Sequence, residues 1–432
     1  MNREHLVVFW FRRDLRIQDN HGLHQALTSG LPVLPVFIFD TEILSQLEDK
    51  KDKRVAYIHQ HLEQINQAFG KKLKVLHTTP KEAFETLTKT YTIQAVYCNE
   101  DYEPQAIKRD TEIAQFLSSK DIVFHSFKDQ VLFEKKDLLK SDQTPYTIYT
   151  PYSKLWKLQM AAQGIPNYPS ENFLDAVLGQ PQPPIPTLEE LGFESVNHNL
   201  PQPQLQEEII ATYGLYRDFP AMDHTTRLGV ALRFGTISVR ACIVFANQHN
   251  QVWLSELIWR EFFMQILYHF PRVVHQCFKT KYEGIQWRNN EAEFEIWCRG
   301  NTGVPIVDAG MRELNTTGFM HNRVRMIVAS YLCKHLLIDW RWGEAYFAQK
   351  LLDYDLSANN GNWQWAAGTG CDAAPYFRIF NPTAQTLKFD KNQEYIKKWV
   401  PEYQDLDYPQ PMVDHQMARL RALEVYKSGI NP

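Results

Sequence analysis

The sequence predicts an α/β domain with a parallel five-stranded sheet, followed by a large all-α domain and joined to it by a long Pro-rich linker. Two observations predict this division. Over the first third of the 432 residues, short apolar runs alternate with helical patterns, whereas from about residue 204 onward the strand pattern largely disappears. Between the two parts, eight of the 23 prolines fall within residues 166–203.

The sheet of the first domain, residues 1–130, is predicted from five apolar runs, each short enough to be a buried strand. They are Leu6–Phe11, Leu34–Phe39, Leu73–His77, Ile93–Cys98 and Ile122–Phe127. Helical patterns stand between them, at Val55–Phe69, Lys81–Lys89 and Glu112–Ser118. Because strands that alternate with helices form parallel sheets covered on both faces, we expect a Rossmann-like arrangement.

The linker, residues 131–203, is predicted to be extended, because its proline density prevents regular helix. The second domain, residues 204–432, is predicted to be helical. Helical patterns cover Leu257–Leu267, Val307–Leu314, Arg323–Leu337 and Glu344–Leu352. The Thr-Gly pair that ends Asn315–Gly318 should separate the second of these helices from the third.

Composition restricts the class of protein. A chain with 44% hydrophobic and 22% charged residues is ordinary for a globular protein, so disorder is excluded as its main state. The net charge of −4 gives no overall positive field, although a local basic groove stays compatible with it. The six cysteines form no CxxC pair, and no apolar run reaches the ~18 residues of a membrane span. We therefore expect a cytoplasmic protein with no membrane association.

Several common catalytic motifs are absent. The sequence has no GxxxxGK[ST] loop, no GxGxxG after a strand, no HExxH and no GxSxG. It also lacks a tight set of His, Cys and Asp residues, so we expect no metal site. Hydrolase and nucleoside-triphosphate chemistry therefore has no support.

The helical region combines many tryptophans with polar side chains. Nine of the 11 tryptophans lie between Trp253 and Trp399. Core packing explains any one of them, but so dense a cluster also fits stacking, base recognition or electron transfer. The polar candidates are Glu256, Asn322, Arg323, Arg325, Asp353, Asp355 and Asn359. Taken singly, each fits a solvated surface or a helix cap, and Asn359 fits a helix C-terminus. Together they would suit a cavity for a planar polar ligand, such as a flavin or a base.

Longer motifs, in a consistent order, resemble the photolyase/cryptochrome family over nearly the whole chain. They are Trp-Phe-Arg-Arg-Asp-Leu-Arg at 10–16, Arg-Asp-Phe-Pro-Ala at 217–221, Thr-Thr-Arg-Leu at 225–228, Glu-Leu-Ile-Trp-Arg-Glu-Phe at 256–262, Met-His-Asn-Arg-Val-Arg-Met at 320–326 and Asp-Ala-Ala-Pro-Tyr-Phe-Arg-Ile-Phe-Asn-Pro at 372–382. The chain is most similar to the family's microbial DNA photolyases for cyclobutane pyrimidine dimers (CPDs), of class I or class III. The resemblance implies an antenna-chromophore domain followed by a helical domain that binds FAD and DNA.

The resemblance implies a U-shaped FAD, reduced and anionic when active. By motif position, the residues that would hold it are Tyr213, Thr225, Thr226, Arg227, Leu228, Gly229, Trp253, Arg260, Arg325, Asp353, Asp355 and Asn359. Gly229 replaces the family's usual serine, so one phosphate contact would come from the backbone. Arg325 would pair with Asp353. Asn359 would face flavin N5, where the CPD photolyase pattern has Asn and the plant cryptochrome pattern has Asp.

The implied activity is light-driven DNA repair, in which the excited reduced flavin passes an electron to a flipped-out dimer, the cyclobutane ring splits, and the electron returns. The motifs imply lesion or DNA contacts by Glu256, Trp259, Asn322, Arg323, Met326, Trp365, Arg378 and Lys388. Trp259 and Trp365 would wall the lesion pocket, and Glu256 would hydrogen-bond a thymine. Arg323, Arg378 and Lys388 would bind backbone phosphates.

A chain of Trp363, Trp340 and Trp287 is implied for reducing oxidised flavin, alongside any packing role. The alternative function is a cryptochrome-type blue-light receptor that signals through protein partners, although plant receptors usually carry a longer tail than this chain has. A (6-4) photolyase would have histidines in place of Asn322 and Met326. A flavin redox enzyme without DNA would explain the cavity but not the DNA-contacting set.

The expected partner is UV-damaged DNA, single- or double-stranded, and the expected state is a monomer. The first domain would either bind a second chromophore, methenyltetrahydrofolate or a deazaflavin, or leave that site empty. Gln105 and Ala106 stand where some relatives have a folate-contacting acid, so the sequence leaves that choice open.

Overall fold

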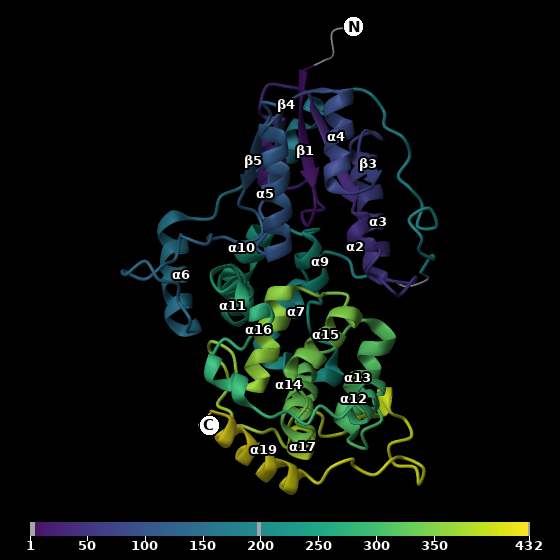
Figure 1. The fold of residues 1–432 in the computed structure, drawn as a ribbon, viewed down its shortest axis with the longest axis vertical. Coiled ribbons are helices and arrows are strands. Elements are labelled where there is room, and N and C mark those ends of the chain that lie inside the picture. The colour runs from purple at the N-terminus through teal and green to yellow at the C-terminus, as the bar shows by residue number, and fades with distance from the viewer. Residues whose placement is uncertain (1–4, 197–199, 431–432) are drawn as a thin grey trace. The chain divides into compact units, whose positions relative to one another are not determined.

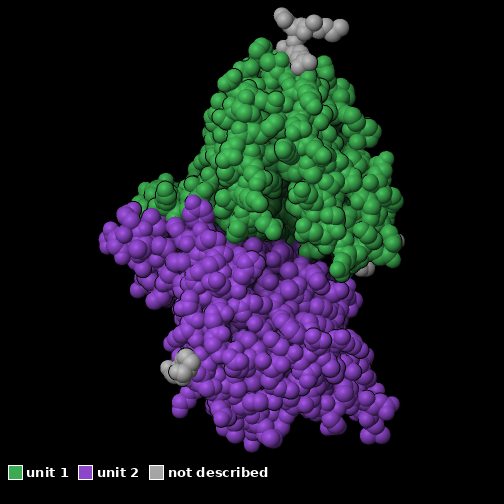
Figure 2. All heavy atoms as spheres, viewed as in Figure 1, with its two compact units in different colours: residues 1–137, 157–205, 227–248 green, residues 138–156, 206–226, 249–432 purple. Residues whose placement is uncertain are grey.

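The structure is a computed structural model that describes residues 5–196 and 200–430 (Figure 1). The chain forms two compact units, coloured separately in Figure 2. Unit 1 comprises residues 1–137, 157–205 and 227–248, and unit 2 comprises residues 138–156, 206–226 and 249–432. The units therefore alternate along the sequence, whereas the predicted domains are consecutive stretches. The assignment of functions to those stretches stays a prediction.

Unit 1 holds a parallel sheet of five strands in the order β3-β2-β1-β4-β5. The strands are β1 (His5–Phe11), β2 (Val33–Phe39), β3 (Lys74–His77), β4 (Thr92–Asn99) and β5 (Val123–Phe127). All five predicted strands are present. The central strands β1 and β2 are buried almost throughout, as expected for a sheet covered on both faces.

Helices and loops complete unit 1. Its elements are α1 (His21–Leu27), α2 (Thr41–Leu44), α3 (Lys53–Ala68), α4 (Pro80–Thr90), α5 (Pro104–Ser118), the 3-10 helix η1 (Ser170–Ala176), α9 (Gly229–Phe234) and most of α10 (Val239–His249). The three predicted helices correspond to α3, α4 and α5, and α1 and α2 are additional. The predicted linker is less extended than expected, because it contains η1 and α6 (Tyr149–Gln163).

Side chains at the carboxyl ends of β1 and β4 are linked by hydrogen bonds. Asn99, which ends β4, accepts a hydrogen bond from the backbone N–H of Gly22 at 2.8 Å. The amide nitrogen of Asn99 donates to Asp14 and Asn20. Ligands of open α/β sheets bind at this switch point between strands. Here protein groups take up its hydrogen bonds, in agreement with the absence of a GxGxxG motif.

Unit 2 contains no strand among its described residues. Its elements are part of α6, α7 (Glu207–Ala211), α8 (Tyr213–Tyr216), η2 (Pro220–Met222), α11 (Gln251–His269), η3 (Pro271–Val274), η4 (Thr280–Gly284), α12 (Glu291–Arg299), α13 (Pro305–Thr317), α14 (Asn322–Ser330), the π-helix η5 (Tyr331–His335), α15 (Trp340–Lys350), α16 (Leu356–Ala367), α17 (Pro382–Phe389), α18 (Glu394–Trp399) and α19 (His415–Ile430). No helix in the described part of the chain is long and apolar enough to span a membrane.

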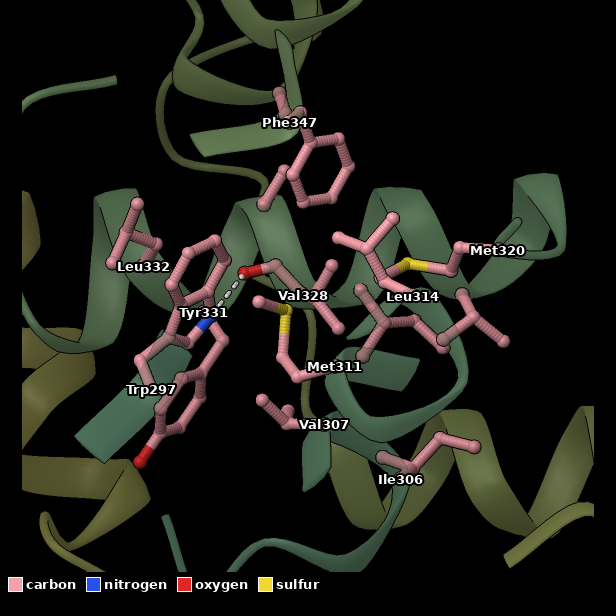
Figure 3. Close-up of a cluster of buried hydrophobic side chains, with 14 of the residues drawn as sticks. Trp297, Ile306, Val307, Met311, Leu314, Met320, Val328, Tyr331, Leu332 and Phe347 are labelled. Atoms are coloured by element: carbon pink, nitrogen blue, oxygen red, sulfur yellow. Dashed lines mark hydrogen bonds between the residues drawn. The ribbon is translucent and has the colours of Figure 1, made fainter. Parts of the chain in front are cut away.

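Three of the predicted helical patterns fall on α11, α13 and α15, and α13 ends at Gly318 with a φ of 74°, as the Thr-Gly pair predicts. The fourth pattern, Arg323–Leu337, differs, because α14 ends at Ser330 and a π-turn follows. A large core cluster of unit 2 includes buried side chains of α13, α14 and α15 (Figure 3). Within it the indole of Trp297 donates to the carbonyl of Val328 at 3.3 Å.

Candidate functional site

Unit 2 contains a pocket with about 590 Å³ of empty space. Eight of the sequence-predicted site residues line it: Asn322, Arg325, Met326, Asp353, Asp355, Asn359, Trp363 and Trp365. The structure thus brings residues predicted for the cofactor and residues predicted for the lesion into one cavity.

Helix α14 forms one side of the pocket. His321 caps it, since its Nδ1 accepts the backbone N–H of Arg323 at 3.1 Å. The helix then presents Asn322, Arg325 and Met326 at spacings of three and four, so the three side chains share one face. Arg325 donates to both carboxylate oxygens of Asp353, at 2.9 and 3.1 Å. The predicted Arg325–Asp353 pair is therefore present.

Helix α16 supplies the opposite polar groups. Asp355 caps it by accepting the backbone N–H groups of Ser357 and Ala358 at 3.1 and 3.2 Å. Asn359 lies inside this helix, so its reading as a helix C-terminus is wrong. Its amide nitrogen donates to the carbonyl oxygen of Glu344 at 3.1 Å and to the carboxylate of Glu344 at 2.8 Å. Both amide hydrogens are thereby used, and the side-chain oxygen is left as an acceptor.

The two predicted aromatic walls come from α11 and α16. Gly361 of α16 allows these helices to meet, because a Cβ there would lie 2.2 Å from the ring of Phe263. Trp259 lies one helical turn from Phe263, and Trp365 lies one turn from Gly361. Both indoles are half-buried, and Trp259 does not line the pocket itself.

Tyr149, at the start of α6, covers one face of Trp259. The two rings stack with centroids 3.7 Å apart and planes 4° apart. The Tyr149 hydroxyl donates to the carbonyl of Ser255 at 2.9 Å. Sequence reasoning placed this residue in the linker and missed it, because the contact joins segments more than a hundred residues apart.

Glu256 forms an ion pair with Arg217 beside this wall. Burial raises the pKa of the Glu256 carboxyl, although the Arg217 guanidinium opposes the shift. The next residue, Asp218, accepts from Arg323 at 2.6 Å. None of the predicted site residues lies in the motif at 217–221, yet the structure joins Arg217 and Asp218 to residues predicted to contact the lesion and DNA.

The predicted phosphate-binding cations differ in exposure. Arg378 and Lys388 are exposed, and the guanidinium of Arg378 lies 5.9 Å from the ring centroid of Trp365. Arg323 is instead largely buried: it is paired with Asp218 and stacked over Phe389 at 4.2 Å. Two of the three cations are thus presented for phosphate contact, and Arg323 is held by protein groups.

The three tryptophans of the predicted chain lie in the core of unit 2 or pack against it. Trp363 and Trp340 are buried, and Trp287 is half-buried at the edge of the same cluster. Gly343 of α15 leaves room for the indole of Trp363, since a Cβ at this position would lie 2.1 Å from that ring. This gradient from buried to partly exposed rings is what an electron path to solvent requires.

The remaining predicted cofactor residues lie outside the pocket lining. Tyr213, Thr225, Thr226, Trp253 and Arg260 belong to unit 2, and Arg227, Leu228 and Gly229 belong to unit 1, where Gly229 begins α9. Arg227 has a φ of 51°, a left-handed conformation that non-glycine residues rarely adopt and that is common at binding sites. No group of three or more metal-ligating side chains occurs among the described residues.

The fold and the pocket define a class of protein with an α/β unit and a helical unit, the latter with a pocket lined by polar groups and indoles. A family profile for DNA photolyase matches residues 7–170, and a profile for the FAD binding domain of DNA photolyase matches residues 253–407. The deoxyribodipyrimidine photo-lyase of Synechococcus sp. is 37% identical, over 97% of this chain and 96% of that protein. That of Escherichia coli is 35% identical, over 98% of each chain.

Solved structures show the same likeness. A bacterial class III photolyase from Agrobacterium tumefaciens is 31% identical, with a TM-score of 0.87, over 100% of this chain and 99% of that one. An archaeal photolyase from Sulfolobus tokodaii with two FAD molecules is 33% identical, with a TM-score of 0.82, over 98% and 99%. A cryptochrome from Synechocystis sp. is 25% identical, with a TM-score of 0.81, over 98% and 100%. The chain belongs to the DNA photolyase family.

Proposed function

We propose that this protein is a light-dependent DNA-repair enzyme that splits UV-induced cyclobutane pyrimidine dimers. One observation carries the proposal beyond family membership. The polar residues expected to hold FAD, Asp353, Asp355 and Asn359, line the same pocket as Asn322 and Met326, which are expected to touch the lesion. An electron donor and a dimer bound there would be neighbours.

The residues of the pocket fit a flavin. The Arg325–Asp353 pair and Asp355 offer charge and hydrogen bonds, and the indole of Trp363 offers an apolar wall. Bound there, reduced FAD would supply an electron to the dimer on absorbing blue or near-UV light and would take it back after the ring has split. Because Glu344 occupies both amide hydrogens of Asn359, the Asn359 oxygen accepts, and it therefore favours a ligand that carries hydrogen at the facing nitrogen.

The lesion would bind against the two indoles. Stacking of a base on an aromatic side chain is worth roughly 1–3 kcal/mol. Glu256 in its protonated form would donate a hydrogen bond to a thymine and stabilise the negative charge that develops on it, and Asn322 would add a second donor. Arg378 and Lys388, both exposed, would bind the flanking phosphates.

Histidine chemistry of the (6-4) type has no support in the pocket. No histidine lines it among the described residues. His321, next to Asn322, is used as a helix cap, and burial lowers the pKa of its imidazole to about 4. A group that stays neutral at physiological pH is a poor proton donor, which favours CPD repair.

The experiment that tests the function is a repair assay in light and in darkness. Chemically reduced protein is mixed with an oligothymidine that carries cyclobutane dimers, and recovery of base absorbance is followed under blue light. Recovery only in the light is expected. No recovery, with a bound flavin that still photoreduces, would contradict repair and would favour a cryptochrome-type receptor.

Tyr149→Leu should weaken binding of dimer-containing DNA about two- to twelvefold, because Trp259 loses a stacked partner worth about 0.5–1.5 kcal/mol. Tyr149→Phe is the matched control, since it keeps the ring and removes the hydroxyl that bonds Ser255. Affinity is measured by fluorescence anisotropy, with flavin absorbance as the check on folding. Equal losses in both variants would assign the effect to the hydroxyl and refute the stacking role.

We also propose that the enzyme is a monomer of the cytoplasm that carries an antenna chromophore in its first domain, either methenyltetrahydrofolate or a deazaflavin. All six cysteines are free thiols, which suits a reducing compartment. Light scattering would test the monomer, and the absorbance of the extracted chromophores would identify the antenna.

A further inference from the structure

Lys334 is a buried lysine that the proposed reaction does not use. It lies in the π-helix η5 and is 1% exposed. Burial lowers the pKa of its ammonium group to about 7. No carboxylate among the described residues pairs with it. An uncompensated buried charge is costly in free energy. The groups that contact the ammonium of Lys334 therefore indicate its role.

The ammonium group of Lys334 joins three elements of unit 2. It donates to the carbonyl of Ala367, the last residue of α16, at 2.8 Å and to the carbonyl of Tyr376 at 3.1 Å. It also lies 3.9 Å from the ring centroid of Tyr426 in α19. A cation at the C-terminus of a helix complements the helix dipole, and a cation over an aromatic ring is attracted to it. These contacts offset the free-energy cost of burying the ammonium group.

Tyr426 reinforces the same junction. Its hydroxyl donates to the Ala367 carbonyl at 2.9 Å, so that carbonyl accepts from both residues. Its ring stacks on the ring of Tyr376 with centroids 6.0 Å apart and planes 7° apart. Tyr376 is therefore held twice, through its backbone carbonyl by Lys334 and through its ring by Tyr426.

Tyr376 belongs to a loop, residues 368–381, that joins α16 to α17. Hydrogen bonds from outside the loop hold Thr369, Asp372 and Tyr376. Of these three points, Tyr376 is the nearest to the loop's exposed tip, Phe377 and Arg378. Phe377 is 61% exposed.

The backbone turn at Lys334 is unusual. The N–H of Leu336 bonds the carbonyl of Tyr331 at 3.1 Å, five residues back, where a regular helix would use four. Such π-turns interrupt helices at a cost and are frequent at functional sites. The interruption lies in the segment that carries the ammonium group toward Ala367 and Tyr376.

We propose that Lys334 is a positioning residue for DNA binding: it fixes the base of the 368–381 loop, so that Arg378 is held beside Trp365 before the damaged strand arrives. The proposal rests on the function proposed above. A loop that is already ordered in the free protein loses less conformational entropy when DNA binds, and this favours binding. Lys334 would act on affinity for DNA, and neither on flavin binding nor on the photochemical step.

The test compares wild-type protein with Lys334→Met and Lys334→Gln. Lys108→Met, which removes a highly exposed lysine of unit 1, is the matched control. The first measurement needs no activity: trypsin cleavage after Arg378 is timed in DNA-free protein. Faster cleavage is expected in Lys334→Met, and an intermediate rate in Lys334→Gln, because glutamine keeps a donor without the charge. Unchanged cleavage in both would overturn the anchoring of the loop.

The second measurement is affinity for an oligonucleotide with one cyclobutane dimer, together with repair per bound dimer. Lys334→Met should bind about tenfold more weakly, the worth of one charge-assisted hydrogen bond, with flavin content and repair per bound dimer unchanged. Loss of flavin along with affinity would overturn the proposal in favour of a general structural role. Failure of wild-type protein to repair dimers in light would refute the proposed function. The trypsin result would still show whether Lys334 holds the 368–381 loop in place.

Discussion

Trp340→Phe is expected to abolish photoreduction of the oxidised flavin and to spare repair by chemically reduced protein. Trp340 is fully buried in the cluster that also holds Trp363 and Trp287. Phenylalanine keeps an aromatic ring in that core but is much harder to oxidise than indole, so the electron path should be broken at its middle. The measurement is the bleaching of flavin absorbance under blue light with an external reductant.

Trp297→Phe is the matched control. Trp297 is also fully buried and contacts Trp363 with centroids 6.2 Å apart, yet it lies outside the predicted chain. It should therefore retain photoreduction. If Trp340→Phe lost both photoreduction and repair, the residue would be a packing residue, and the predicted chain would be wrong at this position.

Glu256→Ala is expected to lower the rate of repair about ten- to a hundredfold while flavin stays bound. A hydrogen bond to a charged group is worth about 1.5–3 kcal/mol, and each 1.36 kcal/mol is a factor of ten. Glu256 does not line the pocket proposed for the flavin, so cofactor content should be unchanged. The measurement is repair yield per absorbed photon at saturating DNA, which separates the photochemical step from binding.

Glu256→Gln is the informative partner of this variant. Because burial raises the pKa of Glu256, its carboxyl takes up a proton at higher pH than an exposed glutamate does, and the acid form can then donate a hydrogen bond. Glutamine also donates, without the charge that pairs with Arg217. We expect it to recover much of the repair that alanine loses. An unchanged yield in Glu256→Ala would refute any role for this carboxyl in the reaction.

The sheet was predictable because its signal is local. A strand such as β2, Val33–Phe39, is buried at every residue. The sequence of such a strand is an uninterrupted apolar run. The break at Gly318 was predictable for the same reason, since the turn needs a left-handed residue and the sequence supplies glycine there.

The details of the site were less predictable, because they depend on pairs distant in sequence. Nothing near Tyr149 signals that it stacks on Trp259, and nothing in the 217–221 motif signals that Arg217 pairs with Glu256. The helical pattern did not reveal the π-turn after Ser330, because apolar residues are spaced similarly before and after the turn. Family resemblance assigned roles to motif positions, but the contacts that orient those positions required the fold.

The hydrogen bonds that α6 donates limit where the protein can be truncated. Trp156 donates to the carboxylate of Glu261 at 2.6 Å and Tyr152 donates to it at 3.2 Å, both from the segment 138–156 that belongs to unit 2. A truncated protein that begins at residue 204 would contain the whole of the predicted helical domain. Its product would lack these two donors to a carboxylate in the middle of α11, and it would lack Tyr149 as well. Any truncation meant to preserve the pocket should therefore keep residues 138–156, even though they lie in what the sequence presents as a linker.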